Sequence, residues 1–274
     1  LLSTPRVLVT GGAGFIGSHI VDALLDAGCP VTVLDDFSSG FRENLNRSSG
    51  DLRIIEGTIQ SANDCRSALE GVGAISHQAA FGSVPRSVEF PEIYSANNLH
   101  GSTVLIAEAQ RAGVRSIVLA SSSSVYGDDH SPLKTEERLG SPLSPYAASK
   151  RAMELFAASI AATSRQSITC LRYFNVFGPR QNPNGPYAAV IPQFLSAMIR
   201  GESPRINGDG EQARDFTYVA NVVAANIAAL SPNEGTPFRT YNIACGNSTS
   251  VNQLFYMLRE LTGTLIEPVY GPER

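Results

Sequence analysis

A glycine-rich turn, Gly11-Gly12-Ala13-Gly14-Phe15-Ile16-Gly17, constrains the fold of this chain more than any other feature. The apolar run Val7–Thr10 before it predicts a buried strand, and the periodic apolar residues of Gly14–Ala27 predict a helix. Glycines in such a turn let backbone N–H groups approach a pyrophosphate, whose charge the helix N-terminus stabilises. The turn therefore predicts a strand–turn–helix unit that binds a dinucleotide.

Short β-branched runs alternate with helical patterns along the first half of the chain. Further strands are expected at Val31–Asp35, Leu52–Glu56, Ala74–His77, Ser116–Ser121 and Ser167–Arg172, and helices at Asp64–Leu69, Asn97–Ala112 and Ser144–Ala162. Continuous apolar strands suit a sheet that is buried on both faces, and strict alternation with helices indicates parallel strands. The expected fold class is α/β, with a Rossmann-type doubly wound parallel sheet.

The character of the sequence changes after Phe174. Residues Gly178–Tyr187 are rich in Pro, Asn and Gly, which predicts a long irregular loop. Helices are then expected at Val190–Arg200, Val219–Leu230 and Val251–Leu261, and a strand at Thr240–Ile243. We expect a dinucleotide-binding domain over residues 1–174 and a smaller mixed α/β substrate lobe over residues 175–274, with some segments returning to the sheet.

Composition narrows the class of protein. The formal net charge of -4 argues against nucleic acid or an anionic membrane as the main partner. The four cysteines lack CxxC spacing and the four histidines are dispersed, so neither a disulfide framework nor a metal site is expected. Without a long apolar run or a signal peptide, the expected location is the cytoplasm. The chain starts at Leu1 and stops at Arg274 without a terminal helix, so we expect trimmed ends.

Asp35 ends the second predicted strand, at the place where a Rossmann fold reads the adenosine ribose. A carboxylate there accepts hydrogen bonds from the ribose hydroxyls and repels a 2′-phosphate. The residue therefore favours NAD over NADP.

Tyr146 and Lys150 lie four residues apart near the start of a predicted helix, so their side chains share one face. A free tyrosine has a pKa near ~10 and is a weak base at neutral pH. The Lys150 ammonium and a positively charged nicotinamide are expected to lower that pKa. A run of serines, Ser121–Ser124, ends a predicted strand at the same edge of the sheet, where a hydroxyl can relay a proton. A surface pair and a capped turn are the alternative interpretations.

These residues resemble those of the extended short-chain dehydrogenase/reductase superfamily, and within it the nucleotide-sugar 4-epimerases. The resemblance spans the chain and rests on Gly11–Gly17, Ser121–Gly127, Ser144-Pro145-Tyr146, Leu171–Asn175 and Arg214-Asp215-Phe216. Three further stretches are similar to the branch that acts on UDP-N-acetylhexosamines, namely Gln78–Ser87, Arg180–Val190 and Ile206–Glu211.

The resemblance assigns roles position by position. It implies a catalytic set of Ser122 at the sugar 4-hydroxyl, Tyr146 as the base and Lys150 as its support. It implies NAD contacts at Gly11, Gly14, Phe15, Ile16, Gly17, Asp35, Asp36, Ser39, Gly40, Thr58, Ile59, Gln78, Ala79, Ala80, Asn97, Ser121, Tyr146, Lys150 and Tyr173. It implies substrate contacts at Gly82, Ser83, Ser122, Ser123, Asn175, Ala189, Val190, Asn207, Arg214 and Arg274, the two arginines pairing with the diphosphate.

Four positions depart from the common family pattern. Thr58 stands where the family usually has an aspartate that holds the adenine. Gly82 replaces a lysine common in UDP-glucose epimerases, and Ala188-Ala189 replaces a pair of asparagines. Smaller side chains leave room for an N-acetyl group, so the resemblance favours UDP-GlcNAc and UDP-GalNAc as the substrates.

The implied reaction is reversible inversion at C4 of the sugar through a 4-keto intermediate. UDP-glucose and a UDP-uronic acid, with or without an N-acetyl group, remain alternative substrates. Dehydratases usually carry Asp-Glu at the positions of Ser123 and Ser124, and decarboxylases a glutamate at Ser124, which disfavours both. A non-catalytic NAD-binding relative would usually lack Tyr146 or Lys150. The superfamily also implies a homodimer built through the helices Asn97–Ala112 and Ser144–Ala162.

Overall fold

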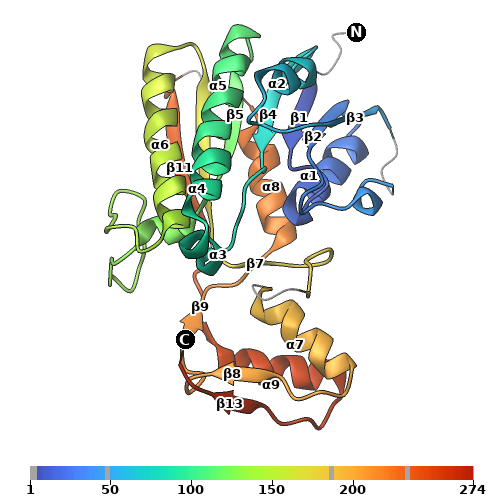
Figure 1. Ribbon diagram of the computed structural model, residues 1–274, viewed down its shortest axis with the longest axis vertical. Coiled ribbons are helices and arrows are strands. Elements are labelled where there is room, and N and C mark those ends of the chain that lie inside the picture. The colour runs from blue at the N-terminus through green and yellow to red at the C-terminus, as the bar shows by residue number, and fades with distance from the viewer. Residues whose placement is uncertain (1–4, 47–49, 185–187, 232–234, 274) are drawn as a thin grey trace. The chain divides into compact units, whose positions relative to one another are not determined.

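The computed structural model of the protein describes residues 5–46, 50–184, 188–231 and 235–273. Over this part of the chain there are two compact units. Figure 1 colours the chain by residue number, so that the segments of each unit can be followed. The first unit comprises residues 1–173 and 219–243, and the second comprises residues 174–218 and 244–274. The chain thus leaves the first unit after Tyr173 and returns to it for one helix and one strand.

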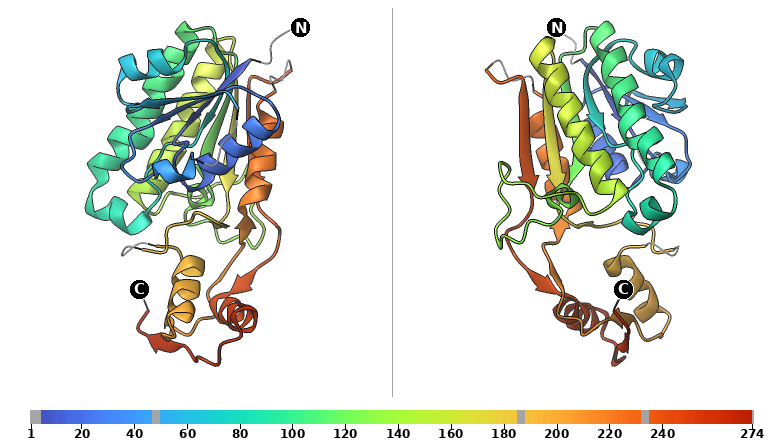
Figure 2. Two further views of the ribbon diagram at one scale, coloured as in Figure 1. Left: turned by 90° about the vertical axis from the view of Figure 1, so that its right-hand side faces the viewer. Right: turned by 60° about the vertical axis from the view of Figure 1, so that its left-hand side comes forward.

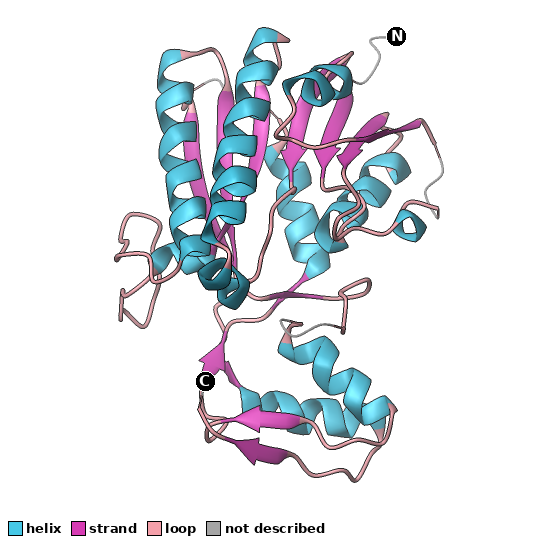
Figure 3. Cartoon of the chain, viewed as in Figure 1, coloured by secondary structure: helices cyan, strands magenta, loops and turns pink. Residues whose placement is uncertain are grey.

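A sheet, whose strands are magenta in Figure 3, forms the middle of the first unit. Over the described residues it has seven strands, in the order β11-β6-β5-β4-β1-β2-β3. All of its neighbouring strands are parallel. Its strands are β1 (Arg6–Thr10), β2 (Val31–Asp35), β3 (Leu52–Glu56), β4 (Val72–His77), β5 (Ser116–Ser122), β6 (Ser167–Tyr173) and β11 (Phe238–Ile243). The strand order reverses between β1 and β4, which places a crevice beyond their carboxyl ends. The predicted doubly wound parallel sheet is confirmed.

Helices cover both faces of this sheet (Figure 2). Val7 and Val9 of β1 pack in one core cluster with the helix that follows the glycine turn, whereas Leu8 packs in a second cluster on the opposite face. This alternation is the two-residue period of a strand. The first face carries α1 (Phe15–Asp26) and α8 (Val219–Ala229), and the second carries α2 (Ala62–Ala68), α5 (Ser102–Arg111) and α6 (Pro145–Thr163).

The expected helix Asn97–Ala112 is a single helical path with an irregular start. Its first part is the π-helix η2 (Ser95–Gly101), which continues directly into α5. The wider π turn allows two consecutive asparagines, Asn97 and Asn98, both to be buried. Such turns occur frequently at functional sites. Short elements that the periodicity did not predict are η1 (Arg42–Asn44), α3 (Val84–Glu89), α4 (Pro91–Tyr94) and η3 (Ser123–Tyr126).

The second unit has its own small core. Phe194 and Phe255 meet edge to face with their ring centroids 6.2 Å apart, and they join α7 to α9. A capping box of Ser250 and Gln253 begins α9, and Gly263 in the left-handed conformation ends it. The elements are β7 (Val176–Phe177), α7 (Val190–Ile199), β8 (Arg205–Asn207), β9 (Ala213–Arg214), β10 (Thr217–Tyr218), β12 (Thr249–Ser250), α9 (Val251–Thr262) and β13 (Val269–Gly271).

Strands of the second unit are short and pair two by two. β10 pairs with β7 and β13 with β8 in parallel, whereas β12 and β9 are antiparallel. Among the described residues of both units, we find no helix with the length and apolar character needed to cross a membrane.

Replacing a central core residue tests the packing of the sheet. Leu119 of β5 is fully buried, so we expect Leu119→Ala to lower the free energy of unfolding by about 2–5 kcal/mol, because it leaves a cavity. Leu133 is 73% exposed, and Leu133→Ala should change that free energy by less than about 0.5 kcal/mol. Urea denaturation measures both values, and equal effects would contradict this core assignment.

Candidate cofactor and catalytic site

A cavity of about 370 Å³ lies in the first unit at the carboxyl ends of the strands. The glycine turn after β1, the end of β2, the turn after β3 and the residues after β4 form its walls. Every residue for which the sequence predicted a cofactor contact lines this cavity. Further lining residues, which were not predicted as cofactor contacts, are Leu34, Ser38, Gly57, Phe81, Gly82 and Ala120. The structure thus brings the predicted cofactor set together, and its contact with a cofactor stays a prediction.

The glycine turn leaves no room for side chains. Gly11 has φ +65°, and a Cβ added to it would lie 2.7 Å from the backbone nitrogen of Ala79. A Cβ added to Gly17 would lie 2.1 Å from the carbonyl oxygen of Gly11. Gly14, the N-cap residue of α1, contributes no side-chain cap, so the positive end of the helix dipole is left for an anionic group.

Asp35 is held rigidly at the end of β2. Its Oδ2 accepts a hydrogen bond from the N–H of Ala13 and its Oδ1 accepts one from the N–H of Phe37, both at 2.9 Å. Burial raises the pKa of Asp35, while these two backbone bonds lower it. Each carboxylate oxygen keeps a second lone pair for a ribose hydroxyl. At the far wall of the cavity, the N–H of Thr58 donates to Asp64.

Tyr146 and Lys150 extend from the first turns of α6 toward the end of β5. The Lys150 ammonium is buried and donates to the carbonyl oxygen of Ala120 at 2.7 Å. Burial lowers the pKa of Lys150 to about 8. Burial also raises the pKa of Tyr146, and its hydrogen bond with Ser122 lowers that pKa by a smaller amount. The expectation that Lys150 lowers the pKa of Tyr146 is wrong for the protein's own groups, because burial dominates.

The serines of the run Ser121–Ser124 have different hydrogen-bond partners. The Ser122 hydroxyl accepts hydrogen bonds from the N–H of Ser124 at 3.1 Å and from its hydroxyl at 2.9 Å, and caps η3. Ser123 begins η3. Ser121 donates to Glu154 of α6 at 2.5 Å. The Ser122 side chain also forms a hydrogen bond with Tyr146. Ser122 is therefore the member of the run that reaches Tyr146, and Ser124 supports it.

Asn226 of α8 is a buried residue that the sequence interpretation missed. Its Nδ2 donates to the Tyr173 hydroxyl at 2.8 Å, and its Oδ1 accepts from Gln78 Nε2 at 3.0 Å and from Ser76 Oγ at 3.1 Å. Burial raises the pKa of Tyr173 to about 12, so its hydroxyl keeps its proton and donates to Gln78. An asparagine on a helix whose only other polar residue is Asn221 was the available signal for this network.

His77, at the end of β4, was also missed. Its Nδ1 lies 2.6 Å from Thr10 Oγ1, and its Nε2 lies 2.8 Å from Ser102 Oγ. Complete burial lowers the pKa of His77 to about 3, so the imidazole is neutral. Thr10 Oγ1 in turn accepts from the N–H of Ala79 at 3.3 Å. His77 thus fixes the backbone that forms one wall of the cavity.

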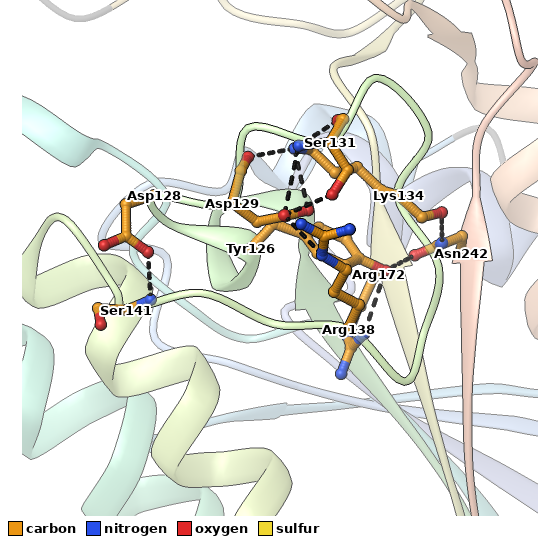
Figure 4. Close-up of polar contacts among 9 residues, drawn as sticks. All are labelled: Tyr126, Asp128, Asp129, Ser131, Lys134, Arg138, Ser141, Arg172 and Asn242. Atoms are coloured by element: carbon orange, nitrogen blue, oxygen red, sulfur yellow. Dashed lines mark hydrogen bonds and ion pairs between the residues drawn. The ribbon is translucent and has the colours of Figure 1, made fainter.

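A buried ion pair joins α6 to the sheet behind the serine run. Arg172 of β6 makes two hydrogen bonds to Glu154, at 2.9 Å and 2.8 Å, and both side chains are almost completely buried. Arg172 also donates to the hydroxyl of Tyr126 at 3.1 Å (Figure 4). The Glu154 carboxylate therefore binds both Ser121, at the end of β5, and Arg172 of the neighbouring strand β6.

The segment between η3 and α6 folds back on this pair. Tyr126 donates to Asn242 Oδ1 at 2.5 Å, and Asn242 Nδ2 donates to the carbonyl oxygen of Lys134 at 3.0 Å (Figure 4). Asp129 accepts from Ser131, which holds the pKa of its carboxyl down to about 2, and forms ion pairs with Lys134 and Arg138. These hydrogen bonds and ion pairs hold the segment between η3 and α6 in a defined structure.

A second cavity of about 280 Å³ lies within the second unit. Asn175, Ala189, Val190 and Arg214 line it, so the structure brings together four of the predicted substrate residues. Gly82 lines the first cavity. Among the described residues, the predicted contacts that line neither cavity are Ser83, Ser122, Ser123 and Asn207. Arg274 lies outside the described residues.

We find no group of three or more His, Cys, Asp or Glu side chains placed to hold a metal ion within the described parts of the chain.

Comparison with known proteins identifies similar chains over nearly the full length. The model of the NAD dependent epimerase/dehydratase family matches residues 7–244. A putative UDP-glucose 4-epimerase from Methanocaldococcus jannaschii is 37% identical, and the match covers 98% of this chain and 86% of the relative.

Solved structures agree with this result. A UDP-N-acetylglucosamine 4-epimerase from Methanobrevibacter ruminantium, in complex with UDP-N-acetylmuramic acid, has a TM-score of 0.94 and 42% identity, covering 100% of this chain and 87% of that one. A UDP-glucose 4-epimerase from Thermus thermophilus, in complex with NAD, has a TM-score of 0.89 and 34% identity, covering 98% and 87%.

The first cavity fits the NAD that such a family uses. An added Cβ at Gly11 or Gly17 would fill the cradle at the start of α1, and a pyrophosphate can enter there. Asp35 lies one strand further along the sheet, where the adenosine ribose belongs.

Gly17→Ala tests this cradle. Because the new Cβ would lie 2.1 Å from the carbonyl oxygen of Gly11, the turn must open, and we expect the affinity for NAD to fall by at least about tenfold. Isothermal titration calorimetry measures this affinity. Gly235→Ala is the control, because an added Cβ there meets open space. Unchanged NAD binding in Gly17→Ala would show that the pyrophosphate does not enter the turn.

Proposed function

This chain belongs to the NAD-dependent epimerase/dehydratase family, and from that premise we propose that it is a 4-epimerase that interconverts UDP-GlcNAc and UDP-GalNAc. The observation that carries the proposal is the grouping of Ser122 with Tyr146 and Lys150, the latter two in the wall of the first cavity. The glycine turn and Asp35 line the same cavity. A base and a dinucleotide cradle therefore share one space, as a reaction of proton and hydride transfer requires.

Bound NAD would supply the acceptor for the C4 hydride and return it to the opposite face of the sugar. The protein's own groups handle the proton. Tyr146 takes the proton of the 4-hydroxyl, and Ser122 holds both oxygens in line through its hydrogen bond with Tyr146. Because burial raises the pKa of Tyr146 and Lys150 by itself does not offset that rise, the phenolate needs further positive charge, which a bound cationic nicotinamide would supply alongside the Lys150 ammonium.

Two features support an N-acetylated sugar. An added Cβ at Gly82 would meet no atom within 4 Å, so the wall of the cavity is open at this position. Ala189 lines the second cavity with a small side chain. UDP-glucose is the second candidate, because relatives that carry that activity in their names are similar to 98% of the chain.

The serine run supports epimerisation over elimination or decarboxylation. Ser124 places its hydroxyl on Ser122 at 2.9 Å, and Ser123 begins η3. Neither residue is a carboxylic acid that could exchange protons at C5 or C6 of a sugar.

Substrate identity is tested with a panel of UDP-sugars and NAD, whose products are separated by chromatography. We expect UDP-GalNAc to form from UDP-GlcNAc. If UDP-galactose forms from UDP-glucose and UDP-GalNAc does not form, the sugar assignment is wrong and the epimerase assignment stands. If no UDP-sugar is epimerised by the protein, the proposed function fails.

Tyr146→Phe tests the base. Because the phenol oxygen is the only proposed proton acceptor for the 4-hydroxyl, we expect kcat to fall by about 100-fold or more. Tyr241→Phe, at a tyrosine that is 45% exposed on β11, is the matched control and should keep the wild-type kcat. A Tyr146→Phe enzyme with wild-type turnover would exclude Tyr146 as the base.

The two ionisations predict the shape of the pH profile. The reactive form needs a tyrosinate and a charged lysine, but Lys150 loses its proton near pH 8, before Tyr146 does. The fraction in that form therefore rises with pH up to about 8 and then stays level until Tyr146 ionises. We expect kcat/KM to show this break. Lys150→Met should lower kcat/KM, and the residual activity should rise through about pH 8 without the break. A break that persists in Lys150→Met would belong to another group.

A further inference from the structure

The backbone N–H groups in the first turn of α6 need hydrogen-bond partners from outside the helix, because N–H groups at this end have none within it. Pro145 has no N–H, and the N–H of Ala147 donates to the side chain of Ser144 at 3.1 Å. The N–H of Ala148 donates to the carbonyl oxygen of Ser144 at 2.9 Å. The remaining N–H is that of Tyr146, and it donates to Ser87 Oγ at 3.0 Å. A residue distant in sequence thus completes the cap.

Ser87 is fully buried in α3, directly after the loop that carries Gly82 and Ser83. Its hydroxyl donates to the carbonyl oxygen of Val84 at 2.6 Å while it accepts from Tyr146. Ser83 caps the same helix through Arg86. The Ser87 oxygen therefore connects the backbone of α3 to the backbone of Tyr146 with both of its hydrogen-bonding functions in use.

An aromatic contact connects the same two parts. The buried ring of Tyr94 meets Tyr146 nearly edge on, at 82° with centroids 6.2 Å apart. On another side it contacts Phe81 with centroids 5.9 Å apart. A shift of the loop would therefore press on the ring that touches Tyr146.

Asn98 provides a third connection. Its side chain binds both backbone groups of Phe81, accepting from the N–H at 2.9 Å and donating to the carbonyl oxygen at 3.0 Å. Its Nδ2 also donates to Ser149 Oγ at 3.3 Å, and Ser149 donates to the carbonyl oxygen of Tyr146 at 2.8 Å. The backbone N–H of Tyr146 is thus tied directly to the Phe81–Ser87 segment, and its carbonyl oxygen is tied to the same segment through Ser149 and Asn98.

We propose that Ser87 is a positioning residue that couples the Phe81–Ser87 segment to Tyr146, so that this segment beside the sugar sets where the phenol lies. The proposal rests on the proposed function, in which Tyr146 takes a proton and the Gly82 wall faces the sugar. Tyr146 is the second residue of its helix, where few intrahelical bonds restrain it. Its alignment with Ser122 therefore depends on the Ser87 contact, and a displacement of about 1 Å can lower a rate by roughly 100-fold.

Ser87→Ala tests the proposal, because alanine removes the acceptor for the Tyr146 N–H and adds no bulk. We expect kcat to fall by about tenfold or more, while KM for the UDP-sugar and Kd for NAD change by less than about threefold. Ser61→Ala is the matched control, because Ser61 Oγ caps α2 through Asp64 at 3.2 Å and lines neither cavity. It should leave kcat unchanged.

The ionisation of Tyr146 gives a second measurement that needs no substrate. The ultraviolet difference between each protein and its Tyr146→Phe counterpart follows this tyrosine alone. Since the bond with Ser122 lowers the pKa of Tyr146, its loss in Ser87→Ala should move that titration to higher pH. Ser61→Ala should leave the titration in place.

The outcomes separate the two proposals. A wild-type kcat and an unmoved titration in Ser87→Ala would overturn the positioning role, and so would an equal loss of kcat and NAD affinity, which a general structural defect produces. If wild-type protein epimerises no UDP-sugar, the proposed function fails, and the Tyr146 titration still decides the role of Ser87.

Discussion

The buried ion pair between Glu154 and Arg172 is the interaction on which the arrangement of the reactive end depends. It joins α6, which carries Tyr146 and Lys150, to β6, and the same carboxylate accepts a hydrogen bond from Ser121 at the end of β5. A buried pair of charges adds little net stability, but removing one partner costs about 3–5 kcal/mol because the other charge is left alone. The pair therefore specifies how α6 sits on the sheet.

Neutral polar groups perform the same task beneath the cofactor cavity. His77 is held uncharged between Thr10 and Ser102, and Asn226 links Gln78 with Tyr173. Each of these groups is buried, so an unpaired donor or acceptor would be costly, and the networks have few alternative arrangements. The walls of the cavity are consequently fixed before a ligand enters.

The ionisable groups of the cavity, Lys150 and Tyr146, differ from these fixed networks, because their protonation can change when a ligand binds. Burial lowers the pKa of Lys150 to about 8 and raises that of Tyr146, so at neutral pH the lysine is still charged while the tyrosine keeps its proton. A bound cationic nicotinamide would favour the tyrosinate. Because the family reaction borrows a hydride and returns it, the tyrosinate is best formed only when the cofactor is in place.

Local sequence was sufficient for much of this protein. A glycine turn between a strand and a helix, with Asp35 one strand later, defines a Rossmann unit through short-range sterics and hydrogen bonding, and every predicted cofactor residue lines one cavity. Tyr146 and Lys150 share a helix face by periodicity alone. Tertiary structure decided the rest: which serine meets Tyr146, the raised pKa of that tyrosine, and the roles of His77, Asn226 and Ser87. These depend on burial and on partners far away in the chain, such as the 59-residue separation between Ser87 and Tyr146, which no local pattern encodes.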